Sequence, residues 1–277
     1  MKQIPIAFIG GGNMARSLIG GLLAGDGEPD RIWVAEPNAG QREFLRGRFG
    51  VHTDANNEEI AARGEVVVLA VKPQILREVA LKLAPVVQAR QPLVISIAAG
   101  VRESDLRAWL GGGSLALVRT MPNTPALVGS AASALFANPF VTEEGRQRAE
   151  SLLRAVGVTV WVDNEDLLDT VTALSGSGPA YFFLLMEALE QAGTAAGLDA
   201  ETARLLTLQT AFGAAKMALE SVDSPATLRV RVTSPGGTTE QALAVLHEGA
   251  MNTLIAKALE AARHRSQELG ELLGGQP

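Results

Sequence analysis

The first half of the chain alternates short apolar runs with longer amphipathic segments. Helical periodicity follows the first run at residues 13–25 and returns at 41–50, 56–64 and 73–87. Apolar runs separated by helices predict β-α-β units and a parallel sheet with helices on both faces. The runs that we expect to form strands lie within residues 4–10, 31–36, 50–53, 65–73, 92–100 and 114–122.

The pattern changes near residue 160. From Asn164 onward we find no strand-like run, only long Ala- and Leu-rich periodic segments interrupted by SGSGPA, GLDAE and TSPGGTT. The fold class that we expect is therefore α/β, with an N-terminal Rossmann-type, doubly wound parallel sheet followed by an all-α domain. We expect the domains to cover residues 1–160 and 161–277.

One segment of the second half, residues 180–192, is apolar on nearly every side. A helix of this kind is normally buried all round. A single subunit with two helical layers could hardly cover it, so we expect a homodimer that forms through the second domain.

Composition excludes several classes of function. The formal net charge is −6, and no basic run offers a surface for nucleic acid. The chain has no cysteine, which excludes disulfides, thiolate catalysis and the common zinc clusters. No signal peptide and no apolar stretch of roughly 20 residues is present. We expect a cytoplasmic protein with no metal, nucleic-acid or membrane partner.

Candidate chemistry begins at the first turn. Residues 10–15, GGGNMA, fit the pattern G-x-G-x-x-A between a strand and a helix. Gly10 would make the tight turn, Gly12 would let the backbone approach a pyrophosphate, and Ala15 would keep helix and strand close. The helix N-terminus adds free amides and a partial positive charge. This position after the first strand favours a dinucleotide site over a merely structural turn.

The second strand ends at Glu36, about 20 residues beyond the glycine turn. A carboxylate there would accept hydrogen bonds from the adenosine ribose and repel a 2′-phosphate, which points to NADH. Alternatively, Glu36 is a solvated strand end and Arg42 reaches the phosphate of NADPH. The sequence leaves both interpretations open.

Three further strand ends should converge on the glycine turn, because ligands of doubly wound sheets lie beyond the carboxyl ends of the strands. They carry Lys72 and Pro73, Ala98-Ala99-Gly100, and residues 119–125. Lys72 is either a ligand-binding group or a solvated charge. Pro122 and Pro125 are best interpreted as rigid connectors.

No acid–base dyad is evident. The histidines His52, His247 and His264 fall outside every motif, and Tyr181 is the single tyrosine. Such a site suits hydride transfer to an already activated acceptor, such as a protonated imine, better than oxidation of a plain alcohol.

Five motifs in order, FIGGGNMA, AVKP, RTMPNTP, LSGSGPAYFF and TSPGGTT, resemble those of the bacterial pyrroline-5-carboxylate reductases. The resemblance extends from Ile4 to about Glu268. It implies NADPH- or NADH-dependent reduction of the C=N bond of 1-pyrroline-5-carboxylate to L-proline, the last step of proline biosynthesis. It also implies a helical dimerisation domain that interlocks with a second subunit, and larger rings built from such dimers.

The resemblance further implies residue roles. Substrate would be bound by Ser234, Gly237, Thr238 and Thr239, with Glu165 a weaker candidate. Glu36 departs from the small hydroxyl residue often found at its position, which leaves the choice between NADH and NADPH open. The implied cofactor-binding residues are Ile9, Gly10, Gly11, Gly12, Asn13, Met14, Asn57, Ala70, Val71, Lys72, Pro73, Ala98, Ala99 and Gly100.

The loop 233–239 precedes a predicted helix. Thr238 and Gln241 fit a capping box, and the amides of residues 236–239 would face a small carboxylate near the positive end of the helix. Given the resemblance, Thr239 would act as the catalytic residue by hydrogen bonding the ring nitrogen. SGSGPA would form a second wall, with Ser177 as N-cap and Pro179 in the first turn of a helix.

Two other functions remain possible from the sequence. A hydroxy-acid dehydrogenase or another imine reductase could share this two-domain build, and the dehydrogenase would need a catalytic lysine among the helices, for which Lys216 and Lys257 are the candidates. A non-catalytic dinucleotide sensor would be expected to lack the loop 233–239, and here it is intact.

Overall fold

The structure, a computed structural model, describes residues 4–274. These residues form two compact units, one of residues 4–177 with 261–274 and one of residues 178–260. The boundaries between these compact units lie at residues 177/178 and 260/261, whereas the sequence predicted a domain boundary near residue 160. The predicted boundary stays a prediction. Residues 1–3 and 275–277 of the two predicted domains lie outside the described residues.

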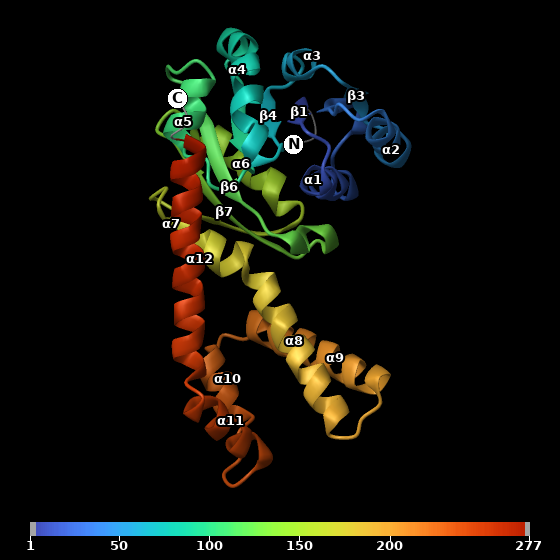
Figure 1. The fold of residues 1–277 in the computed structure, drawn as a ribbon. Coiled ribbons are helices and arrows are strands. Elements are labelled where there is room, and N and C mark those ends of the chain that lie inside the picture. The colour runs from blue at the N-terminus through green and yellow to red at the C-terminus, as the bar shows by residue number, and fades with distance from the viewer. Residues whose placement is uncertain (1–3, 275–277) are drawn as a thin grey trace. The chain divides into compact units, whose positions relative to one another are not determined.

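An eight-stranded sheet forms the centre of the first unit, in the order β3-β2-β1-β4-β5-β6-β7-β8 (Figure 1). All neighbouring strands are parallel except β6 and β7. The strand order reverses on either side of β1, where Ile6 aligns with Ile32 of β2 and Val66 of β4. The strands are β1 (Ile6–Ile9), β2 (Ile32–Ala35), β3 (His52–Asp54), β4 (Val66–Leu69), β5 (Leu93–Ser96), β6 (Leu117–Met121), β7 (Ala131–Ala137) and β8 (Gly157–Trp161).

Six of these strands, β1 to β6, were predicted from their apolar runs, whereas β7 and β8 were not. The β7 sequence AASALFA is rich in alanine, which is depleted in strands and common in helices. Pairing with β6 and β8 on either side makes it a strand nonetheless.

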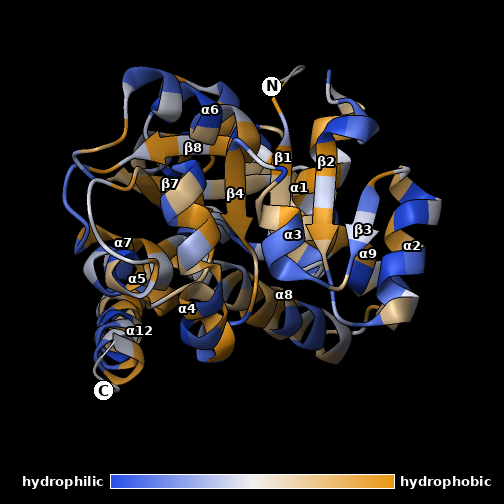
Figure 2. Ribbon diagram, turned by 90° about the horizontal axis from the view of Figure 1, so that it is seen from above, coloured by the Kyte–Doolittle hydropathy of each residue, from blue (hydrophilic) through white to orange (hydrophobic). Residues whose placement is uncertain are grey.

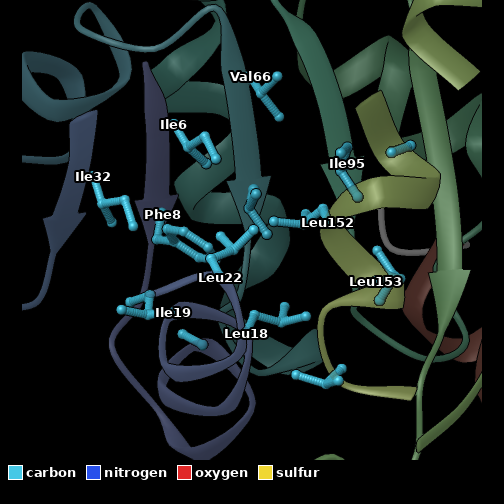
Figure 3. Close-up of a cluster of buried hydrophobic side chains, with 14 of the residues drawn as sticks. Ile6, Phe8, Leu18, Ile19, Leu22, Ile32, Val66, Ile95, Leu152 and Leu153 are labelled. Carbon is cyan, nitrogen blue, oxygen red and sulfur yellow. The ribbon is translucent and has the colours of Figure 1, made fainter. Parts of the chain in front are cut away.

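Helices cover both faces of the sheet because successive strand residues point to opposite sides. Phe8 and Ile6 pack with Leu18, Ile19 and Leu22 of α1 and with Leu152 and Leu153 of α6 (Figure 3). Ile9 packs on the other face with Leu76 and Leu83 of α4 and Leu106 of α5. The helices of this unit are α1 (Asn13–Ala24), α2 (Ala39–Phe49), α3 (Asn57–Ala61), α4 (Pro73–Arg90), α5 (Glu103–Trp109), α6 (Glu143–Arg154) and α7 (Leu167–Val171).

Shorter helical segments complete the first unit. They are the 3₁₀ turns η1 (Pro29–Arg31) and η2 (Thr124–Val128) and the π-helical turn η3 (Thr172–Gly176). The strands β1, β2 and β4 carry apolar residues, while α2 and α3 present polar residues (Figure 2). The predicted class, a Rossmann-type sheet followed by helices, is confirmed.

All the regular elements among residues 178–260, the second unit, are helices. The unit consists of α8 (Gly178–Ala195), α9 (Ala200–Glu220), α10 (Pro225–Arg231), α11 (Thr238–Glu248) and the start of α12 (Met251–Gly274). α8 packs against α9. The caps are local, since Asp199 Oδ1 accepts from Thr202 N at 2.9 Å and Ser224 Oγ accepts from Thr227 N at 3.2 Å. Among residues 4–274, no helix is both long and apolar enough to cross a membrane.

Candidate functional site

The glycine turn after β1 has little room for side chains at two of its three glycines. Gly10 has φ +103°, and a Cβ there would lie 2.6 Å from the carbonyl oxygen of Ala70. A Cβ at Gly11 would lie 2.7 Å from Leu45 Cδ1. A Cβ at Gly12, by contrast, would meet no protein atom within 4 Å, so protein packing does not require a glycine here. Gly12 is the N-cap of α1 and makes no side-chain cap, which leaves open amides and space for a phosphate.

Glu36 lies at the end of β2 and is only 8% exposed. Its Oε2 accepts from Gly11 N at 3.0 Å and its Oε1 accepts from Asn38 N at 3.0 Å. The interpretation of Glu36 as a solvated strand end is therefore wrong, because the carboxylate joins the strand to the glycine turn. Arg42 donates to the carbonyl oxygens of Glu36 and Pro37 at 2.7 and 2.8 Å, which holds its guanidinium beside the same strand end.

The other predicted cofactor residues also lie at strand ends. Asn57 begins α3, where Asn56 provides the cap. Lys72 is the exposed N-cap of α4 and makes no side-chain cap, and Pro73 follows at the first helical position. Gly100 has φ +79°, in the left-handed region that favours glycine.

A cavity of about 330 Å³ opens where the loops after β4 and β5 meet. The sequence predicted Pro73, Ala99 and Gly100 on one side and Ser177 on the other. It did not predict the wall that α12 supplies. The cavity is lined by Pro73, Gln74, Ala99, Gly100, Thr172, Ser177, Ala262, Arg265, Ser266, Leu269 and Leu273.

Ser177 directly precedes α8, which begins at Gly178 with Pro179 in its first turn, and the capping role of its side chain stays a prediction. Its φ and ψ angles, −83° and −21°, are helical, and its amide donates to the carbonyl oxygen of Thr172 at 2.8 Å, five residues back. The π-helical turn that follows α7 therefore closes at Ser177. Asn123 Nδ2 donates to the carbonyl oxygen of Ser175 at 3.0 Å and fixes the turn against the end of β6.

Glu165 takes part in an interior ion pair. Its Oε1 accepts from Arg119 Nη1 of β6 at 2.5 Å and from the amide of Glu103 at 2.6 Å. The two side chains are 18% and 9% exposed, respectively. Both contacts fix the segment that follows Gly100. Sequence reasoning missed the pairing, although the charged Arg119 in the apolar run 114–122 was the signal for it.

A second ion pair lies next to the first. Arg102 Nη1 donates to Asp166 Oδ1 at 2.8 Å, and this hydrogen bond to a carboxylate raises the pKa of the Arg102 guanidinium. Ser266 Oγ of α12 hydrogen bonds to Asp169 Oδ1 of α7 at 2.6 Å. Polar contacts therefore tie α7 both to the start of α5 and to α12.

The loop 233–239 belongs to the second unit and differs from the predicted capping box. Gly237, not Thr238, is the N-cap of α11, and no side chain caps the helix. Glu240 instead reaches back, and its Oε2 accepts from Gly236 N at 2.7 Å. Gly237 N donates to the carbonyl oxygen of Ser234 at 3.0 Å.

Because of this arrangement, only part of the predicted set of anion-binding amides, residues 236–239, is available. The amides of Gly236 and Gly237 already have acceptors, whereas those of Thr238 and Thr239 lie in the first turn of α11, where no intrahelical carbonyl is available. The amides available to a small carboxylate are thus those of Thr238 and Thr239, at the positive end of the helix.

Two of the histidines have local partners. His52 stacks on Trp33 with 4.0 Å between ring centroids, and His264 Nδ1 lies 3.1 Å from Glu268 Oε1. Within the part of the chain that the structure describes, no group of three or more His, Asp or Glu side chains is placed to hold a metal ion.

Comparisons with known proteins cover nearly the whole chain. Residues 165–269 match the family described as "Pyrroline-5-carboxylate reductase dimerisation", and residues 5–100 match "NADP oxidoreductase coenzyme F420-dependent". The chain is 51% identical to the pyrroline-5-carboxylate reductase of Pseudomonas aeruginosa, over 99% of this chain and 100% of that protein.

Solved structures agree. The structure resembles that of a pyrroline-5-carboxylate reductase from Coxiella burnetii with a TM-score of 0.93 and 48% identity, covering 96% of this chain and 98% of that one. It also resembles the Plasmodium falciparum pyrroline carboxylate reductase with NADP bound, with a TM-score of 0.85 and 30% identity, covering 98% and 99% of the two chains.

Proposed function

The chain belongs to the pyrroline-5-carboxylate reductase family, and from this premise we propose which of its residues carry the reaction. The reaction is the NAD(P)H-dependent reduction of the C=N bond of 1-pyrroline-5-carboxylate to L-proline, the last step of proline biosynthesis. The observation that supports our assignment most strongly is the glycine turn, with open space at Gly12 beside the start of α1.

The cofactor site that we propose runs along the carboxyl ends of β2, β1, β4 and β5. Glu36 marks the adenosine end and the cavity beside Gly100 marks the nicotinamide end, because a dinucleotide crosses the point where the strand order reverses. The remaining residues of the site are Ile9, Gly10, Gly11, Gly12, Asn13, Met14, Asn57, Ala70, Val71, Lys72, Pro73, Ala98 and Ala99.

The substrate site that we propose is the loop before α11. The amides of Thr238 and Thr239 bind the substrate carboxylate with help from the hydroxyl of Ser234, and Gly237 keeps the approach free of side chains. Glu165 is less suited to touch substrate, since its carboxylate is already paired with Arg119. We propose instead that Glu165 holds the segment after Gly100 in place.

Proton transfer in this site relies on the substrate rather than on a strong general acid. When bound, the reduced nicotinamide supplies a hydride for the imine carbon. Thr239 hydrogen bonds the ring nitrogen, which arrives protonated or receives its proton from water through this hydroxyl. This scheme needs no histidine, in keeping with the local partners of His52 and His264.

Purified protein mixed with pyrroline-5-carboxylate and either NADH or NADPH tests the proposal directly. We expect nicotinamide absorbance to fall and L-proline to accumulate in equal amounts. A hydroxy-acid dehydrogenase would instead oxidise hydroxy acids through a free lysine. Lys216 does not fit that role, because its ammonium pairs with Glu220 on the same helix.

Cofactor preference depends on Glu36. If its carboxylate faces the adenosine ribose, Glu36→Ser should raise kcat/KM for NADPH relative to NADH by about tenfold, since a charge that repels the 2′-phosphate is lost. The variant also loses the hydrogen bonds from Gly11 and Asn38 to the Glu36 carboxylate, but this loss should lower kcat/KM equally for both cofactors, so it cancels in the ratio. Glu36→Gln is the matched control that keeps the shape without the charge, and it should shift the ratio in the same direction. A ratio unchanged in both variants would show that Glu36 does not contact this end of the cofactor.

Self-association follows from the dimerisation family that residues 165–269 match, and we propose that the assembly is a homodimer or a larger oligomer built from it. In the single chain, Phe182, Phe183 and Leu184 of α8 are 64%, 65% and 67% exposed, and Phe212 of α9 is 62% exposed. An exposed patch of large apolar side chains on neighbouring helices indicates a surface that another subunit buries.

We expect light scattering to show at least a dimer at micromolar concentration. Phe183→Glu should raise its dissociation constant about 100-fold or more, because it places a charge in an apolar interface. Leu81→Glu is a suitable control, since Leu81 is an exposed leucine of α4 in the other unit. A wild-type protein that remained a stable, active monomer would refute the proposal.

A further inference from the structure

The hydroxyl of Ser177 has no role in the function proposed so far, yet it lines the cavity at the nicotinamide end of the site. The cavity also contains the hydroxyls of Thr172 and Ser266. Thr172 Oγ1 donates to the carbonyl oxygen of Leu168 at 2.7 Å, and Ser266 Oγ hydrogen bonds to Asp169 at 2.6 Å. Ser177 is the third hydroxyl residue of this cavity, and it is partly exposed.

The π-helical turn explains why Ser177 is where it is. One extra residue per turn shifts the side chains that follow it, so Ser177 reaches the cavity while Ser175 does not. The turn is firmly fixed. Asn123 binds the carbonyl oxygen of Ser175, and a Cβ at Gly176 would lie 2.4 Å from Met121 Cε, so Gly176 lets β6 and the turn approach each other.

The opposite side of the cavity consists of Pro73, Gln74, Ala99 and Gly100, where Gln74 has a polar side chain and is exposed. A nicotinamide ring beside them presents a carboxamide, with one carbonyl acceptor and one NH₂ donor. A serine hydroxyl can both donate and accept and so can pair with either group. Arg265 is the charged side chain of the cavity, and its Nη1 already bonds to Glu268 Oε2 at 2.7 Å.

We infer that Ser177 is a cofactor-binding residue that hydrogen bonds the carboxamide of the nicotinamide ring and fixes the orientation of that ring. The inference rests on the cofactor site proposed above, and it adds a residue from the helical side of the cavity. Fixing the carboxamide determines which face of the ring is presented to the substrate.

Binding measurements on Ser177→Ala can test this role, because alanine is a good helix former and should preserve the turn. The ligands are NADH, NADPH and ADP-ribose, which lacks the nicotinamide ring. We expect the variant to bind both dinucleotides about fivefold more weakly, as for the loss of one hydrogen bond, and to bind ADP-ribose as the wild type does.

Ser175→Ala is the matched control on the same turn. The Ser175 hydroxyl donates to the carbonyl oxygen of Val171 at 3.1 Å and lies outside the cavity, so this variant should bind all three ligands normally. Equal weakening of ADP-ribose and dinucleotide binding by Ser177→Ala would overturn the inference, as would no change in either. A wild-type protein that binds neither ADP-ribose nor the dinucleotides would refute the proposed cofactor site itself, and the inference with it.

Discussion

Replacing Thr239 by alanine is expected to lower kcat about 100-fold while leaving the dissociation constant of NAD(P)H nearly unchanged. Thr239 lies in the first turn of α11, and we assign its hydroxyl to the nitrogen next to the carbon that accepts hydride. Losing one preorganised bond to a group whose charge changes in the transition state typically costs about 10²-fold or more. Steady-state kinetics with saturating cofactor, together with direct cofactor titration, would measure both quantities.

Ser234→Ala serves as the contrasting variant in the same loop. Its hydroxyl would help to hold the substrate carboxylate equally in the ground and transition states, so its loss should raise KM and leave kcat near the wild-type value. Full turnover by Thr239→Ala would place the substrate elsewhere and contradict the assignment of the whole loop.

Removal of the Arg119 guanidinium is expected to produce the largest loss of stability. Arg119→Met should lower the free energy of unfolding by about 3 kcal/mol, because the Glu165 carboxylate would remain in the interior without its cation. Urea denaturation at a fixed protomer concentration measures this, since association contributes to the apparent stability of an oligomer.

Two further variants test whether the loss of stability comes from the unpaired charge of Glu165 rather than from the loss of an arginine as such. Adding Glu165→Gln to Arg119→Met should recover part of the loss, because the amide oxygen can still accept from Glu103 N without a buried charge. Arg154→Met removes an ion pair on the surface of α6 and should change the free energy of unfolding by less than about 1 kcal/mol. If Arg119→Met were as mild as Arg154→Met, the ion pair would not be an interior one in solution.

The parts of the molecule that could be predicted from sequence are those that depend on neighbours along the chain. The glycine turn is such a part, because Gly10 and Gly12 are separated by two positions and follow an apolar strand directly. The strands β1 and β4 are surrounded by other strands and helices, so their runs of valine and isoleucine were clear signals. β7 lacked that signal since alanine suits helices as well.

Other features depend on residues far apart in the sequence, and no local pattern predicts them. Arg119 and Glu165 are 46 positions apart, and only the folded sheet brings β6 to the segment before α7. The predicted capping box failed for a different reason. A capping box pairs the N-cap residue with the residue three positions later. The prediction placed this pair at Thr238 and Gln241, but the helix begins one residue earlier, so the N-cap is Gly237 and the residue three positions later is Glu240.

The residues of α12 that line the cavity are synthesised last, and this affects when the cavity can form during translation. Gly100 and Ser177 belong to the part of the first unit that leaves the ribosome early, whereas Ala262, Arg265 and Leu269 belong to its second part, after residues 178–260. A nascent chain can form the sheet and the glycine turn before these residues are translated. The end of the site that we assign to the nicotinamide lacks this wall until then. On this assignment we expect tight binding of the complete dinucleotide to be a late event in biogenesis, and a chain on a ribosome stalled near residue 260 to bind only the adenosine half.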